Sequence, residues 1–140
     1  MVRMSKSTLR SYAHCTFRIW LHMVFVTKYR RRVLSPPILG RLKEHFARVC
    51  ENAGCELAEM NGEADHVHLL VDAGPNVQPS RLVNTLKTIS SREIRKEFGR
   101  ELARHYRKPV LWTRAYCVLS AGGAPLDVIK AYIQNQGQDG

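Results

Sequence analysis

The order of strand-like and helix-like segments is the feature of this sequence that most restricts its fold. Residues 15–27 (CTFRIWLHMVFVT) are rich in β-branched and aromatic side chains, which predicts a strand. Because alternate residues of a strand share a face, the two faces should differ in character. One face would carry Phe17, Ile19, Leu21, Met23 and Phe25, and the other would carry Arg18, Trp20 and His22.

A helix and two more strands are predicted next. Residues 36–52 begin with a proline pair and have apolar residues at helical spacing, and Gly54 is a suitable stop. Residues 55–60 predict a short strand, Asn61–Gly62 a turn, and residues 66–71 a third strand.

The second half of the chain repeats the alternation. Residues 79–98 predict a helix with an apolar stripe, and a fourth strand is expected around residues 115–119. A last helix should occupy residues 124–136. The order β-α-β-β-α-β plus a terminal helix predicts the ferredoxin-like, RRM-like α+β fold. Its antiparallel sheet would have helices on one face and an open face for function.

Length and composition are consistent with one domain over residues 1–140, in which 44% of the residues are hydrophobic. Residues 1–13 are polar and basic and are expected to form a loose arm. No apolar run reaches ~18 residues and no export signal is evident, so we expect a soluble, cytoplasmic protein. The four cysteines lack paired spacing, which favours free thiols over a zinc ribbon.

The chain is strongly basic. It has 22 Lys and Arg against 12 Asp and Glu, a formal net charge of +10. Such an excess favours a polyanionic partner, either nucleic acid or an acidic membrane surface.

The segment DHVHLLV carries the chemistry. On a strand, Val67, Leu69 and Val71 would face the core, and His66, His68 and Leu70 the opposite side. The two histidines would lie roughly 6–7 Å apart at Cα, close enough to bind one metal ion. One or both could instead be surface residues. A histidine-triad hydrolase would need a third histidine where Leu70 stands, and a structural zinc site would need two more ligands nearby.

The last helix contains a second candidate pair. Tyr132 and Gln136 are four residues apart and therefore share a face. They could be a solvated surface pair. Alternatively, the Gln136 side-chain oxygen would complete a ligand set with the two histidines, suited to Mg²⁺ or Mn²⁺. Tyr132 would then stand beside a metal-bound phosphate.

Four segments and their order together resemble a known family. The segments HMVFVTKYRRRVL, DHVHLLV, LKTISSREIRKEF and LWTRAYCVLSAGGAPLDVIKAYIQNQ, and their order, are similar to the TnpA-type transposases of minimal insertion sequences. These belong to the His-hydrophobic-His (HUH) endonuclease superfamily, and the resemblance spans about residues 14–137. Ala64 and Gln134 depart from the usual residues, but neither removes a ligand or the nucleophile.

The resemblance implies a function and a site. His66, His68 and Gln136 would be the metal ligands, and Tyr132 the nucleophile that forms a 5′-phosphotyrosine. Members of the family act as homodimers, in which the tyrosine helix of one subunit can serve the other. They cut and rejoin single-stranded DNA at hairpins that mark the element ends. The resemblance places the protein with the nucleoid of a bacterium or archaeon.

Supporting roles are expected for other residues. Asp65 could orient the first histidine, or it could cap a turn. Tyr29 or Trp20 could stack on an unpaired base. Phosphate contacts are expected from Lys28, Arg30, Arg31, Arg32, Lys87, Arg92 and Arg95.

Two alternative functions share the fold or the chemistry. The first is a non-catalytic module that binds single-stranded nucleic acid, as RNA-recognition domains do with aromatic residues on an open sheet. The second is an HUH relaxase or replication nickase, which cuts at one origin and does not join two hairpin ends.

Overall fold

The computed structural model describes residues 19–74, 76–120 and 133–135. Their order confirms the predicted β-α-β-β-α-β succession. The elements are β1 (Ile19–Val26), η1 (Lys28–Arg30), α2 (Pro36–Asn52), β2 (Glu56–Glu63), β3 (His66–Ala73), α3 (Pro79–Glu97), α4 (Gly99–Ala103) and β4 (Cys117–Ser120).

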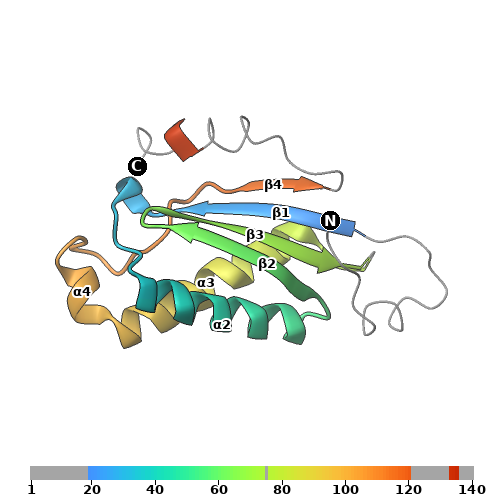
Figure 1. The fold of residues 1–140 in the computed structure, drawn as a ribbon, viewed down its shortest axis with the longest axis horizontal. Coiled ribbons are helices and arrows are strands. Elements are labelled where there is room, and N and C mark those ends of the chain that lie inside the picture. The colour runs from blue at the N-terminus through green and yellow to red at the C-terminus, as the bar shows by residue number, and fades with distance from the viewer. Residues whose placement is uncertain (1–18, 75, 121–132, 136–140) are drawn as a thin grey trace.

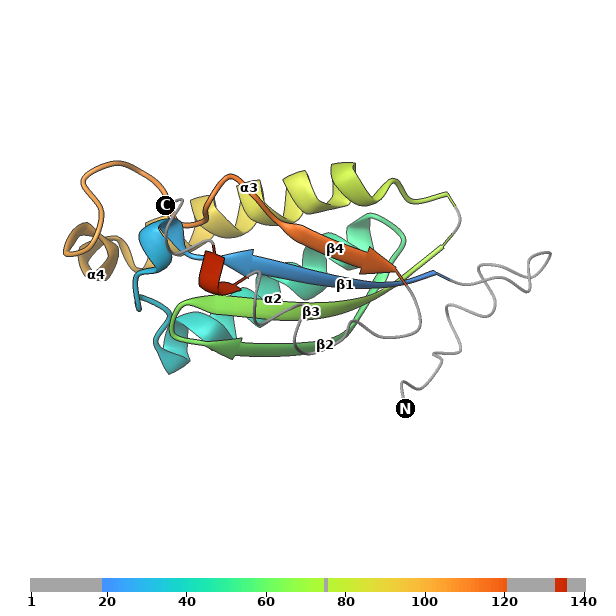
Figure 2. The same ribbon diagram turned by 90° about the horizontal axis from the view of Figure 1, so that it is seen from above.

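The four strands form one sheet in the order β2-β3-β1-β4, and each neighbouring pair is antiparallel. Helices α2 and α3 lie together against one face of this sheet (Figure 1). The short helical segment 133–135 lies on the opposite side, above β1 in the second view (Figure 2). The α+β class and the helices on one face are therefore as predicted.

The core lies between the sheet and the two long helices, where alternate residues of the central strands are buried. Phe25 of β1 packs against Phe46 of α2 and against Trp112, with ring centroids 5.8 Å apart in both pairs. The strand residues in this layer are Leu21, Met23, Phe25, Val67, Leu69 and Val71. The helix residues that cover them include Ile38, Leu42, Phe46, Val49, Leu82, Val83, Leu86 and Ile94.

Most element boundaries agree with the sequence, and one prediction is wrong. Gly54 has a φ of 79°, as expected for a residue that follows a helix end. Asn61–Gly62 does not form the turn. Both residues lie inside β2, and the β2–β3 turn is at residues 64–65. A Cβ at Gly62 would lie 2.7 Å from Leu39 Cδ2, so glycine here allows the start of α2 to approach the strand.

Other differences are smaller. The helix α4 was not predicted, and α3 ends one residue earlier than expected. Residues 1–18 and most of the predicted last helix lie outside the described residues. Cys50, Cys55 and Cys117 are free thiols. Among the described helices, none is both long and apolar enough to cross a membrane.

A buried hydrogen bond ties α3 to the segment that leads into β4. The indole Nε1 of Trp112 donates to Ser90 Oγ at 2.9 Å, and both residues are buried. The Ser90→Ala variant leaves this N–H without a partner, so we expect a loss of about 1–3 kcal/mol in the free energy of unfolding. Urea denaturation measures it, with Thr88→Ala on the exposed side of α3 as the control. Equal midpoints for both variants and wild type would show that the bond does not stabilise the fold.

Candidate metal and nucleic-acid site

The histidines of β3 lie where the strand alternation predicted. Val67, Leu69 and Val71 are fully buried under the helices, whereas His66 and His68 belong to the opposite face and are partly exposed. In the antiparallel register, Val26 of β1 lies opposite His66, and Val24 lies opposite His68. The histidine pair therefore lies at the start of a central strand, beside the last residues of β1.

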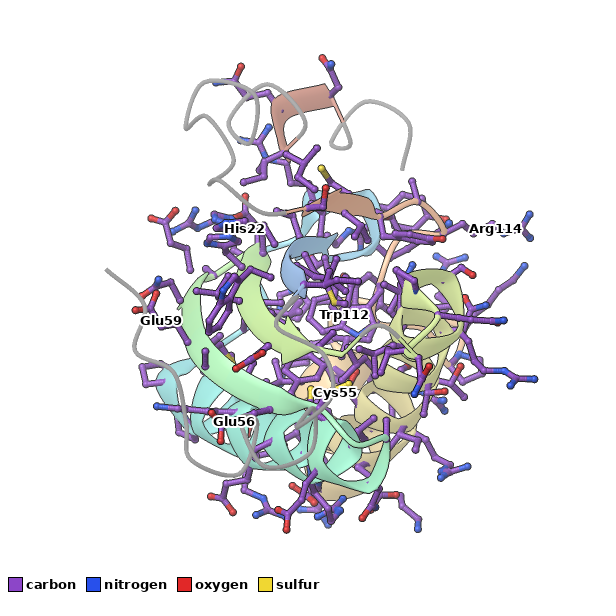
Figure 3. The ribbon with its side chains drawn as sticks, turned by 90° about the vertical axis from the view of Figure 1, so that its right-hand side faces the viewer. His22, Cys55, Glu56, Glu59, Trp112 and Arg114 are labelled. Atoms are coloured by element: carbon purple, nitrogen blue, oxygen red, sulfur yellow. The ribbon has the colours of Figure 1, made fainter. Side chains whose placement is uncertain are left out.

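A third imidazole adjoins this pair. His22 of β1 lies on the face of the sheet away from α2 and α3 (Figure 3). Its Nδ1 is 3.0 Å from Nε2 of His68, and the two rings are stacked with centroids 5.2 Å apart. The strand pattern put His22 on this face, but no spacing within one strand could indicate a partner 46 residues away.

The electrostatic surroundings keep His68 in its neutral form. Burial lowers the pKa of His68, the neighbouring His22 lowers it further, and Glu59 opposes this effect. A neutral imidazole has one nitrogen without a proton, which can accept a hydrogen bond or bind a metal ion at neutral pH.

Asp65 holds His66 in a defined orientation. Its Oδ1 is 2.8 Å from Nδ1 of His66, and its Oδ2 accepts a hydrogen bond of 3.1 Å from Nε of Arg30. Burial would raise the pKa of Asp65, but the hydrogen bonds from His66 and Arg30 outweigh it, and the pKa lies below its usual value. The carboxylate is thus ionised and can accept a hydrogen bond from Nδ1–H of the imidazole.

The backbone of Asp65 is fixed as well. Its carbonyl accepts a hydrogen bond of 3.0 Å from the amide of Thr27, and it lies 3.1 Å from the Thr27 hydroxyl, which it shares with the carbonyl of Arg31 at 2.7 Å. Thr27 follows directly after β1, so the β2–β3 turn is joined to the end of that strand. The aspartate therefore both shapes the turn and orients the histidine, the two roles that the sequence left open.

The donor set suits a divalent metal. With Nδ1 of His66 turned to a carboxylate, Nε2 is the nitrogen left for a ligand, and the exposed Glu63 lies 3.4 Å from it. A carboxylate on the far nitrogen is the usual support of a metal-binding histidine. The predicted third ligand, Gln136, and the predicted nucleophile, Tyr132, lie outside the described residues.

The described part of the terminal segment docks beside this pair. Ile133 is 9% exposed and packs against Val24, Val26 and Cys117. The two valines are the residues directly opposite His68 and His66 in the sheet. The chain segment around Ile133 is thereby held on the face that carries the histidines.

The predicted phosphate-binding residues fall into two groups. Lys28, Arg30, Arg31 and Arg32 lie at η1 and just after it, next to the Asp65 turn. The other group belongs to α3, which covers the opposite face of the sheet (Figure 1).

The α3 group already has contacts within the protein. Lys87 Nζ donates to the backbone carbonyls of Thr113, Arg114 and Ala115, and burial lowers the pKa of this lysine to about 8. Arg92 lies 3.7 Å from Glu93, and Arg95 donates to Ser91. The group around η1 is therefore the one that adjoins the histidines.

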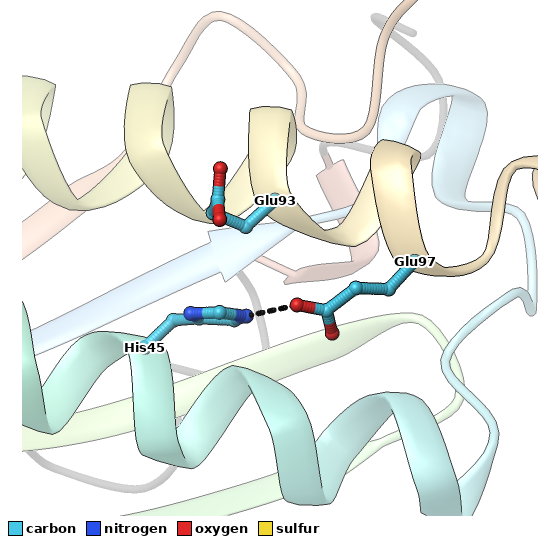
Figure 4. A group of neighbouring side chains, drawn as sticks. All are labelled: His45, Glu93 and Glu97. Atoms are coloured by element: carbon cyan, nitrogen blue, oxygen red, sulfur yellow. Dashed lines mark hydrogen bonds and ion pairs between the residues drawn. The ribbon is translucent and has the colours of Figure 1, made fainter.

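A second cluster of potential metal ligands lies between α2 and α3. His45, Glu93 and Glu97 have ligand atoms within 4.8 Å of one another (Figure 4). However, Arg41 donates two hydrogen bonds to Glu97, at 2.8 and 2.9 Å, and Arg48 is 2.8 Å from Nδ1 of His45. The hydrogen bonds from Arg41 and His45 lower the pKa of Glu97 to about 2.

This second cluster has the properties of an ion-pair network. Two guanidinium groups already neutralise it, and its atoms lie on the helix side of the sheet, away from His66 and His68. A metal ion there would have to displace Arg41 from Glu97.

Two transposases are similar to this chain in sequence. A transposase for insertion sequence IS200 of Salmonella typhimurium is 30% identical over 127 residues, which span 91% of this chain and 82% of that protein. The ISDra2 transposase TnpA of Deinococcus radiodurans is 28% identical over 120 residues, 86% of this chain and 85% of that protein.

Solved structures are similar as well. A crystal structure assigned as a transposase from Deinococcus radiodurans R1 has a TM-score of 0.80 at 28% identity, covering 97% of this chain and 98% of that one. A tyrosine transposase bound to a REP hairpin shares the fold, with a TM-score of 0.54, 11% identity, and coverage of 88% and 68%.

The model of a family described as "Transposase IS200 like" matches residues 15–136, nearly the whole chain. The chain therefore belongs to the IS200-like transposase family.

Proposed function

We propose that this transposase cleaves and rejoins single-stranded DNA at hairpin-marked element ends, with Tyr132 as the nucleophile and with His66, His68 and Gln136 binding a divalent metal ion. The observation that carries the proposal is the docking of Ile133. It packs on Val24 and Val26, which lie opposite the two histidines in the sheet. Tyr132 precedes Ile133 directly, and Gln136 follows three residues later.

The metal ion, Mg²⁺ or Mn²⁺, would polarise the scissile phosphate and offset the negative charge that grows on its oxygens. The residues of the chain prepare for this role. Asp65 accepts a hydrogen bond from Nδ1–H of His66. Burial and the neighbouring His22 lower the pKa of His68, so that its imidazole is neutral. Both histidines are thus in the form in which imidazole binds metals.

The chemistry proceeds in two transfers. The Tyr132 hydroxyl attacks the phosphorus in line, the bond from phosphorus to the 3′ oxygen breaks, and a 5′-phosphotyrosine and a free 3′-OH result. The phenolic proton leaves and the 3′ oxygen gains a proton. A second 3′-OH then attacks the phosphotyrosine, which reseals the strand and restores the phenol. The energy of the phosphodiester bond is kept in the phosphotyrosine linkage, so no nucleoside triphosphate is needed.

We also propose that the protein acts as a homodimer on two DNA ends. In the conformation described here, Ile133 lies on its own chain's sheet. This supports a segment that serves its own histidines in one state, and we propose that it is exchanged between subunits in another. Joining of two hairpin ends is the activity that separates a transposase from a nickase acting at one origin.

The first prediction concerns the nucleophile. With Tyr132→Phe, we expect no covalent adduct between the protein and the downstream fragment of a 3′-labelled strand, because the attacking oxygen is gone. Binding of the DNA should change less than about threefold. Tyr116→Phe, which alters a different tyrosine that is exposed, is the control and should form the adduct at the wild-type rate. An undiminished adduct with Tyr132→Phe would exclude Tyr132, and no adduct with wild type under any divalent metal would favour the binding-only alternative.

The second prediction concerns Asp65. In the Asp65→Ala variant, His66 loses the acceptor that orients it, and we expect Mn²⁺ affinity to fall about 10- to 100-fold. Titration calorimetry without DNA measures this, and saturating Mn²⁺ should restore much of the cleavage. Glu63→Ala removes an exposed acid of the same hairpin and should change affinity much less. If both variants bind Mn²⁺ as wild type does, Asp65 serves only the turn.

The third prediction concerns Ile133. The Ile133→Asp variant places a charge against Val24 and Val26, which should release the terminal segment from the histidine face. We expect the cleavage rate to fall about a hundredfold, since misplaced reacting groups lose that much. Hairpin binding should persist. Gln134→Ala, at the exposed next residue, should cleave normally. Full cleavage by Ile133→Asp would mean that the docking is unrelated to activity.

A further inference from the structure

A hollow at the end of β1, between η1 and residues 105–114, has no role in the mechanism above. We call it the Tyr29 pocket. Its volume is about 530 Å³, within the range of roughly 300–1,000 Å³ that is typical of small-ligand sites. It is lined by Lys28, Tyr29, Arg31, His105, Tyr106, Arg107, Lys108, Val110, Trp112 and Arg114.

The lining is strongly cationic. It contains five lysines and arginines and one histidine, with no aspartate or glutamate. Within the described part of the chain, Arg107, Lys108 and Arg114 make no salt bridge, and all three are exposed. Arg114 projects away from the body of the protein (Figure 3). These cations are available to an anionic ligand.

Aromatic rings provide the second element of the pocket. The Tyr29 side chain is 52% exposed, an unusual position for a large ring. Arg31 lies between two tyrosines, 5.3 Å from the centroid of Tyr29 and 5.9 Å from that of Tyr106. Tyr106 is anchored, because its hydroxyl donates to the Lys28 carbonyl at 2.7 Å. The arrangement offers a flat, exposed ring beside a set of positive charges.

The backbone beneath the ring is strained. Tyr29 and Arg30 have φ angles of 59° and 54°, in the left-handed region that residues with a Cβ seldom adopt. Thr27 holds them there, since its carbonyl accepts from the Arg30 amide and its hydroxyl donates to the Arg31 carbonyl. Strain of this kind occurs at functional sites more than elsewhere. With this backbone conformation, Tyr29 lines the pocket while Arg30 contacts Asp65.

We propose that the Tyr29 pocket binds one unpaired nucleotide of the DNA strand next to the scissile phosphate. The base would stack on Tyr29, and Arg107, Lys108 and Arg114 would hold the adjoining phosphates. A nucleotide matches both the exposed ring and the cations of the lining, because its base can stack and its phosphates are anionic. An inorganic anion would not stack on the ring, and a neutral aromatic ligand would not pair with the cations.

The pocket is joined to the histidine site through two side chains. Arg30, next to Tyr29, contacts Asp65, and Asp65 contacts His66. A DNA strand bound at His66 would therefore reach the pocket by passing over Asp65 and Arg30. The proposal rests on the proposed function for its choice of DNA, and the experiment below separates the two.

The experiment measures binding of the full chain to oligodeoxythymidine of about 15 nucleotides by fluorescence anisotropy, in EDTA so that no cleavage occurs. With Tyr29→Leu, we expect the Kd to rise about tenfold, because base stacking is lost, whereas Tyr29→Phe should bind as wild type does. Tyr116→Leu, at an exposed tyrosine outside the pocket, should have little effect.

A double variant tests the phosphate contacts. Each contact on single-stranded DNA contributes about 0.7 to the slope of log affinity against log salt, so Arg107→Ala with Lys108→Ala should reduce this slope by about 1.4. Lys43→Ala with Arg100→Ala removes two exposed cations elsewhere and is the matched control. Equal losses in the two double variants would reduce the effect to net charge and overturn the pocket.

Photocrosslinking gives a readout that does not depend on the folding of a variant. Wild-type protein irradiated with an oligonucleotide containing 5-iododeoxyuridine should form an adduct on the peptide with Tyr29. Adducts found only elsewhere would overturn the proposal, even if wild type still forms the phosphotyrosine. If the Tyr29 adduct forms but no phosphotyrosine does, the pocket stands and the proposed catalytic function fails.

Discussion

The contacts of Asp65 are the constraint on which the rest of this structure depends. Its carbonyl binds Thr27 at the end of β1, and its two carboxylate oxygens bind Arg30 and His66. One residue therefore fixes a hairpin turn, the path of the chain after β1 and the orientation of an imidazole. Because the carboxylate is ionised and partly buried, each partner is held by a charge-assisted bond, which is stronger than a neutral one.

The sheet separates stability from chemistry. The alternation of a strand sends every second residue of β3 into the core and the others to the opposite face. The core face is sealed by α2 and α3, and it tolerates no polar residue without a partner. The other face can carry His22, His66 and His68 at low cost, because water or a docked segment completes their contacts. Ile133 covers the part of this face formed by Val24, Val26 and Cys117.

The sequence predicted the fold well because the fold depends on local periodicity. The apolar stripes at 36–52 and 79–98 and the alternation at 66–71 are short-range patterns, and the helices and strands formed there. The turn at Asn61–Gly62 was wrong for a tertiary reason, since Gly62 makes room for Leu39 of a helix that lies earlier in the chain. The residue types that favour turns could not have predicted that contact.

The candidate site was predictable in part. Two histidines on one strand face follow from spacing alone, and the structure brings Asp65 to one of them. His22 and the Tyr29 pocket required the register of β1 on β3 and the return of residues 104–114 to the end of β1. Such contacts between distant parts of the chain are fixed by packing, and a sequence pattern within one element holds no information on them.

The basic excess illustrates the same point for charge. A formal net charge of +10 suggests a surface uniformly attractive to DNA. Much of that charge is already engaged, because Arg41 binds Glu97, Arg48 contacts His45, and Lys87 is turned to backbone carbonyls. These side chains stabilise the packing of α2, α3 and the segment before β4.

Three of the cations without such contacts are gathered at one place. Arg107, Lys108 and Arg114 come from the connection between α4 and β4, and they face the same hollow as Lys28 and Arg31. This hollow is joined through Arg30 and Asp65 to His66. Under the proposed function, these charges would attract a phosphate chain to the end of β1.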